Sequence, residues 1–248
     1  MKLEVIVSSY EDAAIANNIV DNILLCTATN LMGLTANIST LKMIKRDFNL
    51  KVSGLVRVRG AGFNYTDLEF AEMKEQVKDL IANKVDSLVF GILNDNFEID
   101  KIRVKEIVDL AKANQVKIYF SSAFDLVNDV DKAMDDLIEL GFDGVKTRGL
   151  NSDIELGLIK LTELNQKYQD KLEIIATGNI NYTNIEEIAM QTGIRSMTVN
   201  ASIRNEDHTT VNNGIDFSYL RENQYEKISP YMLNRMKFIL DNSLFLKD

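Results

Sequence analysis

The chain has 248 residues, 46% of them hydrophobic and 26% charged, a composition typical of a globular protein with one large domain or two small ones. Its formal net charge of −9, from 28 Lys and Arg against 37 Asp and Glu, argues against nucleic acid and anionic membranes as partners. No apolar run approaches the roughly 20 residues of a membrane span, and the single cysteine excludes an internal disulfide.

Eight short apolar segments have the pattern of strands. They are residues 2–8, 22–26, 51–59, 87–93, 116–120, 144–147, 172–177 and 196–200. Each is followed by a segment with apolar residues at helical spacing. These predicted helices cover residues 11–19, 39–48, 66–83, 101–113, 127–140, 152–168, 183–192 and 229–241. Capping boxes at 66–69, 152–155 and 183–186, and a serine–proline pair at 229–230, mark four of the helix starts.

Short apolar strands that alternate with amphipathic helices predict a parallel sheet. Eight units at a period of roughly 30 residues favour an α/β fold with a single (β/α)8 TIM barrel. We expect one domain over residues 1–248, with a long polar loop at about 202–228 before the last helix. A doubly wound open sheet is the alternative, but the glycine-rich dinucleotide fingerprint is missing after the first strand.

Two arginines stand out at the end of the third predicted strand. Arg57 and Arg59 are two positions apart, so on a strand they project to the same face. Glycines at 60 and 62 then turn the chain into the next helix. Two guanidinium groups at a barrel mouth could hold a phosphate, sulfate or carboxylate. The structural alternative is an ion pair with a neighbouring carboxylate such as Asp125.

Several motifs resemble those of the CutC family, in the same order along the first 200 residues. They are residues 21–26, Met-Gly-Leu-Thr at 32–35, residues 56–65, Ala-Phe-Asp at 123–125, and Thr-Gly-Asn-Ile at 177–180 with Asn184. Residues 56–65 resemble the family's arginine-proline-arginine-glycine-glycine-aspartate-phenylalanine run. The resemblance implies a TIM barrel, a link to copper homeostasis with copper as a ligand, a cytoplasmic location and a homodimer. The first residues are charged and strand-like, unlike a signal peptide, which also favours the cytoplasm.

This chain departs from the family where polar side chains are expected at strand ends. Leu24 stands for a glutamate, Gly62 for an aspartate, Ser121 and Ser122 for a histidine–arginine pair, and Thr198 for a histidine. In addition, a valine at position 58 replaces the proline between the arginines. We therefore expect a divergent site that keeps the scaffold and the arginines but has lost acid–base groups.

Cys26 ends the second predicted strand and is the candidate metal ligand. A thiolate is a soft donor suited to Cu(I), for which one sulfur is not a tight site. Met32, Met197 or a second Cys26 across a dimer could assist. The alternative is a small buried hydrophobic residue, the usual state of a lone cysteine. His208, the only histidine, is expected to be solvated in the polar loop, so a zinc site or a His-based triad is not predicted.

Other candidates follow the later strands. Asp125 and Lys146 end strands five and six and could form a carboxylate–cation pair with a catalytic acid or base, or a buried structural pair. Arg148 lies just beyond, as a ligand-binding candidate. Gly178, Asn179 and Asn200 follow strands seven and eight, where barrels commonly bind phosphate through backbone N–H groups. A tight turn into a helix capped by Thr183 is the alternative.

The sequence leaves two main hypotheses of function. One is a copper-homeostasis protein that binds copper through Cys26. The other is an enzyme, or a degenerate enzyme-derived binding protein, that holds a small anionic or sugar-like molecule through Arg57 and Arg59. Whether the protein is an enzyme stays open at this point.

Overall fold

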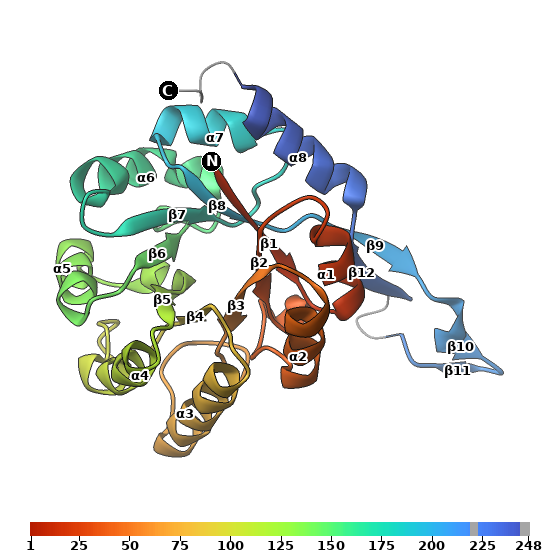
Figure 1. Ribbon diagram of the computed structural model, residues 1–248, viewed down its shortest axis with the longest axis horizontal. Helices are drawn as coiled ribbons and strands as arrows, with labels where there is room; N and C mark the ends of the chain where they lie inside the picture. Colours follow the sequence, from red (N-terminus) through yellow and green to blue (C-terminus); the bar gives the residue numbers. More distant parts are fainter. Residues whose placement is uncertain (219–222, 244–248) are drawn as a thin grey trace.

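The computed structural model describes residues 1–218 and 223–243, and its centre is a closed barrel of eight parallel strands (Figure 1). Each strand pairs with the next in chain order, and β8 closes onto β1, with Glu4 opposite Thr198. The strands are β1 (Lys2–Val7), β2 (Asn22–Leu25), β3 (Lys51–Leu55), β4 (Ser87–Phe90), β5 (Lys117–Phe120), β6 (Gly144–Thr147), β7 (Glu173–Thr177) and β8 (Ser196–Val199). The predicted single (β/α)8 TIM barrel is confirmed.

The described residues form eight α-helices, which surround the barrel (Figure 1). They are α1 (Tyr10–Ala16), α2 (Ile38–Asp47), α3 (Asp67–Ala82), α4 (Lys101–Ala113), α5 (Val130–Leu140), α6 (Ile154–Tyr168), α7 (Ile185–Thr192) and α8 (Pro230–Asn242). No helix in the described part of the chain combines the length and the apolar character needed to cross a membrane.

The helix starts test the predicted caps. The capping box of Thr66 and Glu69 is present at α3, and the Ser229 side chain caps α8 with proline at its first position. Asp153, not Ser152, caps α6, where a carboxylate is the better acceptor for helix N–H groups. At α7 the Thr183 hydroxyl donates to Asn181 Oδ1 (2.6 Å), so it is not the cap and Asn184 precedes the helix.

Strand side chains alternate between two environments, as period-two geometry requires. Outward residues such as Ile23, Leu25 and Val52 pack into the large core beneath the helices. Inward residues include a small apolar cluster of Leu24, Cys26, Leu55 and Val89. The barrel interior therefore has an apolar wall on the side of β2, β3 and β4.

The third strand is shorter than predicted. It ends at Leu55, because the Arg57 N–H turns to the Thr35 hydroxyl oxygen (2.9 Å) and leaves the sheet. Arg57 and Arg59 therefore lie beyond the strand, and the prediction that they share one strand face is wrong. Likewise α5 starts at Val130, after the short 3-10 helix η2 (Ser122–Leu126), and not at residue 127.

The predicted polar loop at 202–228 is instead an arm of short strands. β9 (Ser202–Glu206) pairs with β12 (Gln224–Ile228), and β10 (Val211–Asn212) pairs with β11 (Ile215–Asp216), after a 3-10 turn, η3 (His208–Thr210). Figure 1 shows the arm, in blue, projecting beyond the ring of helices. Buried Asp12 of α1 fixes its base by accepting from the Ile228 N–H (3.0 Å). Residues 219–222 lie outside the described residues.

Candidate functional site

A cavity of about 240 Å³ opens at the C-terminal end of the barrel, where barrel enzymes build their active sites. Inward strand residues form its base, and the loops after the strands form its walls. Seven predicted site residues line it: Cys26, Arg57, Lys146, Arg148, Gly178, Asn179 and Asn200. Two others, Arg59 and Asp125, are not part of its lining.

An ion pair crosses the barrel beneath the cavity. Lys146 Nζ donates to Glu4 Oε2 and to Thr198 Oγ1 (2.6 Å), and the Thr198 hydroxyl donates to the same Glu4 oxygen (2.6 Å). Glu4 Oε1 accepts from Ser53 Oγ (2.6 Å), which in turn accepts from Ser87 Oγ (2.7 Å). Lys146 is only 3% exposed, so its charge depends on Glu4 for neutralisation.

Burial by itself would raise the pKa of Glu4. The charge and hydrogen bond of Lys146, with hydrogen bonds from Ser53 and Thr198, hold that pKa below its ordinary value. Glu4 is therefore a carboxylate at neutral pH. Because each of its oxygens already accepts hydrogen bonds from protein groups, it is oriented rigidly toward Lys146.

Lys146 is not paired with Asp125, in contrast to the prediction. Asp125 Oδ1 accepts from Thr147 Oγ1 (2.5 Å) and from the N–H groups of Arg148 (3.0 Å) and Leu150 (3.1 Å). Burial raises the pKa of Asp125, and these hydrogen bonds oppose the rise. Its carboxylate accepts hydrogen bonds that stabilise the loop after β6, and it does not form an ion pair with Lys146.

Arg57 is 5% exposed and holds the neighbouring loops together. Nη1 donates to the carbonyl oxygens of Leu31 (2.8 Å) and Gly33 (3.2 Å), and Nη2 donates to that of Ala61 (2.5 Å). The guanidinium carbon lies 5.1 Å from the centroid of the Phe63 ring. Nε is buried and has no hydrogen-bond partner among the residues that the structure describes. The Nη1 and Nη2 groups of Arg57 therefore connect the loops around it. Its Nε–H group remains available to a ligand.

Arg59 points to α3. Nε lies 2.5 Å from Glu69 Oε1, Nη2 lies 3.2 Å from Glu69 Oε2, and the Asn64 carbonyl accepts a further bond (2.7 Å). Arg59 is the main reason why the pKa of Glu69 is lowered. The structural alternative thus describes Arg59, with Glu69 as its partner and not Asp125.

Tyr65 contributes a buried hydroxyl that the sequence reasoning missed. It lines the cavity, and its oxygen has no hydrogen-bond partner within the described chain. Burial raises the pKa of Tyr65, and the charges of Arg57 and Arg59, with a smaller contribution from the Arg57 side chain as a nearby hydrogen-bond donor, oppose that rise. An unpartnered buried polar group costs about 1–3 kcal/mol, which a bound ligand or water would offset. The position of Tyr65 shortly after the glycines at 60 and 62, beyond the end of a barrel strand, could have identified it as a candidate from the sequence.

The loops after β6 and β7 meet at the other side of the cavity. Gly178, at φ +89°, lets the Arg148 side chain lie across its turn: a Cβ there would be 2.6 Å from Arg148 Nε. Arg148 Nε is also buried, with no hydrogen-bond partner in the described part of the chain. Asn179 follows in the left-handed region, at φ +54°, a conformation that asparagine tolerates. Asn200, after β8, accepts from the Ser202 N–H (3.1 Å).

The positions that depart from the family pattern lie mostly in this cavity. Leu24, Ser121, Ser122 and Thr198 line it, whereas Gly62 does not. Thr198 is part of the ion-pair network. Glu4 was missed because its place in an alternating strand does not reveal whether it faces inward.

The donor set fits copper poorly. Cys26 is buried, and burial, assisted by the Asp12 and Glu226 charges, raises the pKa of its thiol to about 12, so the thiol is protonated. Met32 lines the same cavity, but Met197 belongs to the core outside the barrel. Among the described residues no three His, Cys, Asp or Glu side chains converge to hold a metal ion. The side chain of His208 is 85% exposed on the arm, as predicted.

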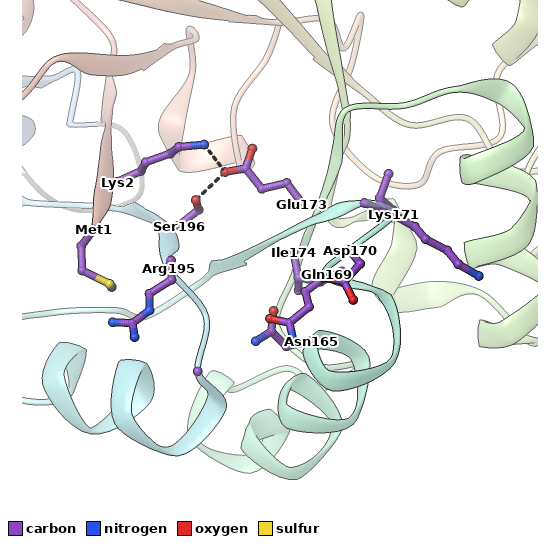
Figure 2. A pocket seen from close by; sticks show the side chains of 12 residues that line it. Met1, Lys2, Asn165, Gln169, Asp170, Lys171, Glu173, Ile174, Arg195 and Ser196 are labelled. Atoms are coloured by element: carbon purple, nitrogen blue, oxygen red, sulfur yellow. Dashed lines mark hydrogen bonds and ion pairs between the residues drawn. The ribbon is translucent and has the colours of Figure 1, made fainter. Parts of the chain in front are cut away.

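A wider depression of about 670 Å³ lies at the opposite end of the barrel (Figure 2). There Glu173 accepts from Lys2 (2.8 Å) and from the Ser196 hydroxyl (2.5 Å), as Figure 2 shows. These residues lie at the N-terminal ends of the strands, the end that serves stability in this fold. We therefore take the smaller cavity as the candidate site.

Comparisons with known proteins agree with this fold. The model of the CutC family matches residues 1–203, a match that ends where the arm begins. A CutC family protein of Treponema denticola is 34% identical over 211 residues, 85% of each chain. The human copper homeostasis protein cutC homolog is 30% identical over 192 residues, 77% of this chain and 70% of that protein. The crystal structure of CutC from Streptococcus agalactiae is 24% identical, with a TM-score of 0.75 over 80% of this chain and 97% of that one.

Proposed function

The chain belongs to the CutC family, and from this premise we propose that its C-terminal cavity binds a small organic anion. One observation carries the proposal. The lining holds three cationic side chains, Arg57, Lys146 and Arg148, and no Asp or Glu among the described residues that form it. In a chain with a net charge of −9, such a surface favours a negatively charged guest.

Two features of the cavity limit the size and the chemical class of the ligand. A cavity of about 240 Å³ has room for about eight water molecules, which suits a molecule of a few carbon atoms. Its wall at Leu24, Leu55 and Val89 is apolar, so part of the ligand is hydrocarbon. The anionic end would meet the unpartnered donors of Arg57, Arg148 and Tyr65.

This proposal differs from the sequence hypothesis in the arginine that it uses. Arg57 is retained, but Arg59 is engaged with Glu69 and does not line the cavity. Arg148 takes its place, from the opposite side of the barrel mouth.

Ligand-observed NMR with a panel of small carboxylates and phosphate monoesters tests the proposal. We expect saturation transfer to at least one anion, weakened about tenfold in Tyr65→Phe and Arg148→Gln. Tyr231→Phe and Arg46→Gln are matched controls, because both side chains are exposed and outside the cavity. Equal binding by the site and control variants, or no binding by any anion, would overturn the proposal.

Copper binding is the second candidate. The names of the relatives favour it, and Cys26 and Met32 line one cavity. The protonated thiol and the 64% exposure of Met32 count against it. Competition for Cu(I) with a chromogenic chelator decides: binding that is the same in Cys26→Ser and the native chain removes this candidate.

We also propose that the protein works in the cytoplasm. Its only cysteine is a free thiol inside the barrel, and free thiols persist where glutathione keeps cysteines reduced. Fractionation of the native cells tests this, since recovery from a secreted or membrane fraction would contradict it.

A further inference from the structure

We propose that Lys146 forms an imine with the carbonyl carbon of its ligand, so that the cavity takes a small oxo acid. The inference rests on the proposed anion site and deepens it, because it names the reactive group of the ligand. It depends on the placement of one amine and on the groups that hold it.

Lys146 is the only lysine of the described chain that is buried. Its neighbours Val145 and Thr147 face outward or into the loop network, whereas its own side chain lies inside the barrel and lines the cavity. Nζ is held from below by Glu4 and Thr198, which engage two of its three N–H groups. The Tyr119 ring flanks it, with its centroid 6.0 Å from Nζ. The third N–H group of Lys146 therefore remains available to a ligand in the cavity.

Glu4 is placed to move the protons that imine formation requires. It takes one proton from the Lys146 ammonium, directly or through the Thr198 hydroxyl, and the freed lone pair attacks the carbonyl carbon. A second N–H proton passes to the former carbonyl oxygen to give a carbinolamine. Glu4 then returns its proton to that hydroxyl, the C–O bond breaks, and water leaves as the C=N bond forms.

The charges balance across this sequence. The ammonium begins with three protons and the iminium keeps one, the other two leaving in the water molecule. The iminium carries the same single positive charge as the ammonium, so the Glu4 carboxylate keeps its counter-ion throughout. A buried carboxylate left without a partner would be strongly unfavourable, and this reaction never leaves one in the final state.

The surroundings favour an oxo acid over a simple aldehyde. Arg57 and Arg148 line the cavity, and each has a buried Nε–H group without a hydrogen-bond partner among the described residues, which suits a carboxylate beside the carbonyl. The apolar wall of Leu24, Leu55 and Val89 limits the water that would hydrolyse the imine.

Reductive trapping tests the inference. The native chain is incubated with glyoxylate and sodium cyanoborohydride, which delivers hydride to the iminium carbon, and the modified lysines are mapped by peptide mass spectrometry. We expect carboxymethylation at Lys146 that saturates with glyoxylate and exceeds that of the exposed Lys84 by about tenfold. Propanal, which lacks the carboxylate, should label Lys146 less selectively.

Two variants probe the positioning by Glu4. Glu4→Gln retains hydrogen-bonding capacity but removes the proton acceptor, so labelling at position 146 should slow about tenfold while labelling of Lys84 stays unchanged. Thr198→Val, which disturbs the charge less, should slow labelling to a smaller degree. The mapping of the native chain needs neither variant to fold.

The outcomes separate the two proposals. If anions bind in the NMR panel and only exposed lysines are trapped, the imine is wrong and the anion site stands. If Lys146 is trapped with equal selectivity by glyoxylate and propanal and no anion of the panel binds, Lys146 forms imines with small carbonyl compounds in general, and the oxo-acid ligand and the anion site are both wrong. Saturable, glyoxylate-selective labelling of Lys146 supports both.

Discussion

Glu4 and Lys146 meet inside the barrel although 142 residues separate them, and their ion pair joins β1 to β6 across the interior. Lys146 lines the cavity that we assign to a small anion, and Glu4 contacts Lys146 from outside that lining. The pair therefore affects both the stability of the fold and the chemistry of the site.

The stability role predicts strong coupling between the two residues. Lys146→Met leaves the Glu4 carboxylate buried and unpaired, and we expect a loss of about 3–5 kcal/mol in the free energy of unfolding. The double variant Glu4→Gln, Lys146→Met should lose less than the sum of the single variants, by about 1–3 kcal/mol. Urea denaturation measures both, and additive losses would show that the pair does not interact.

The same pair predicts a dependence on pH. The pKa of Glu4 lies below its ordinary value of 4.5 in the folded chain, so the unfolded chain binds the proton first as pH falls. The stabilisation is fully present above about pH 4.5 and is lost as pH falls through the lower folded pKa. The difference in unfolding free energy between the native chain and Glu4→Gln should shrink from about pH 6.5 to about pH 3.5. A constant difference would contradict this assignment.

Cys26 should be unreactive in the folded protein. Burial raises the pKa of its thiol from 9.0 to about 12, so at about pH 8 the thiolate fraction falls by about a thousandfold relative to an exposed cysteine. We expect the chromogenic disulfide DTNB to label the native chain far more slowly than the urea-unfolded chain. Equal rates would mean an accessible thiolate and would revive Cys26 as a metal ligand.

Gly178 should resist substitution. Alanine at its φ of +89° is strained, and its Cβ would collide with the Arg148 side chain. Gly178→Ala should lower stability by about 1–2 kcal/mol and weaken anion binding by displacing Arg148. Gly62→Ala is the matched control, since a Cβ there meets no atom within 4 Å. Thermal unfolding and the NMR panel measure the two effects, and similar behaviour of both variants would contradict the role of the turn.

Substitution of Arg57 and of Arg59 should have different effects on stability and anion binding, although the sequence predicted that both arginines hold the ligand. The ion pair of Arg59 with Glu69 is partly exposed, so Arg59→Gln should cost about 0–1 kcal/mol and leave anion binding unchanged. Arg57→Gln removes the hydrogen bonds of a buried side chain to three carbonyl groups, so it should destabilise the protein more and weaken anion binding. A loss of binding in Arg59→Gln would restore the paired-arginine site.

The fold was predictable because barrel strands and helices carry their signals locally. Residues 144–147 were predicted as a strand from the repeating pattern of short apolar segments between helices, and the capping box of Thr66 and Glu69 predicted the start of α3. The arm was not predictable, because its strands are exposed on both faces and lack an apolar alternation.

The site was predictable only in part. Lys146, Arg148 and Gly178 follow from their places at strand ends. The partners of the charged groups could not be predicted from the sequence. Closure of the barrel brings Glu4 of the first strand to Lys146 of the sixth strand, and a local turn places Arg59 beside Glu69. Tyr65 was overlooked because its missing hydrogen-bond partner is a property of packing.

Crystals of the native chain grown with glyoxylate, without reductant, test the central claim most directly. The account predicts ligand density in the C-terminal cavity, with its carboxylate within hydrogen-bond distance of the Tyr65 hydroxyl or of Nε of Arg57 or Arg148. A cavity that holds only water at saturating glyoxylate, in crystals that diffract well enough to show it, would contradict the account.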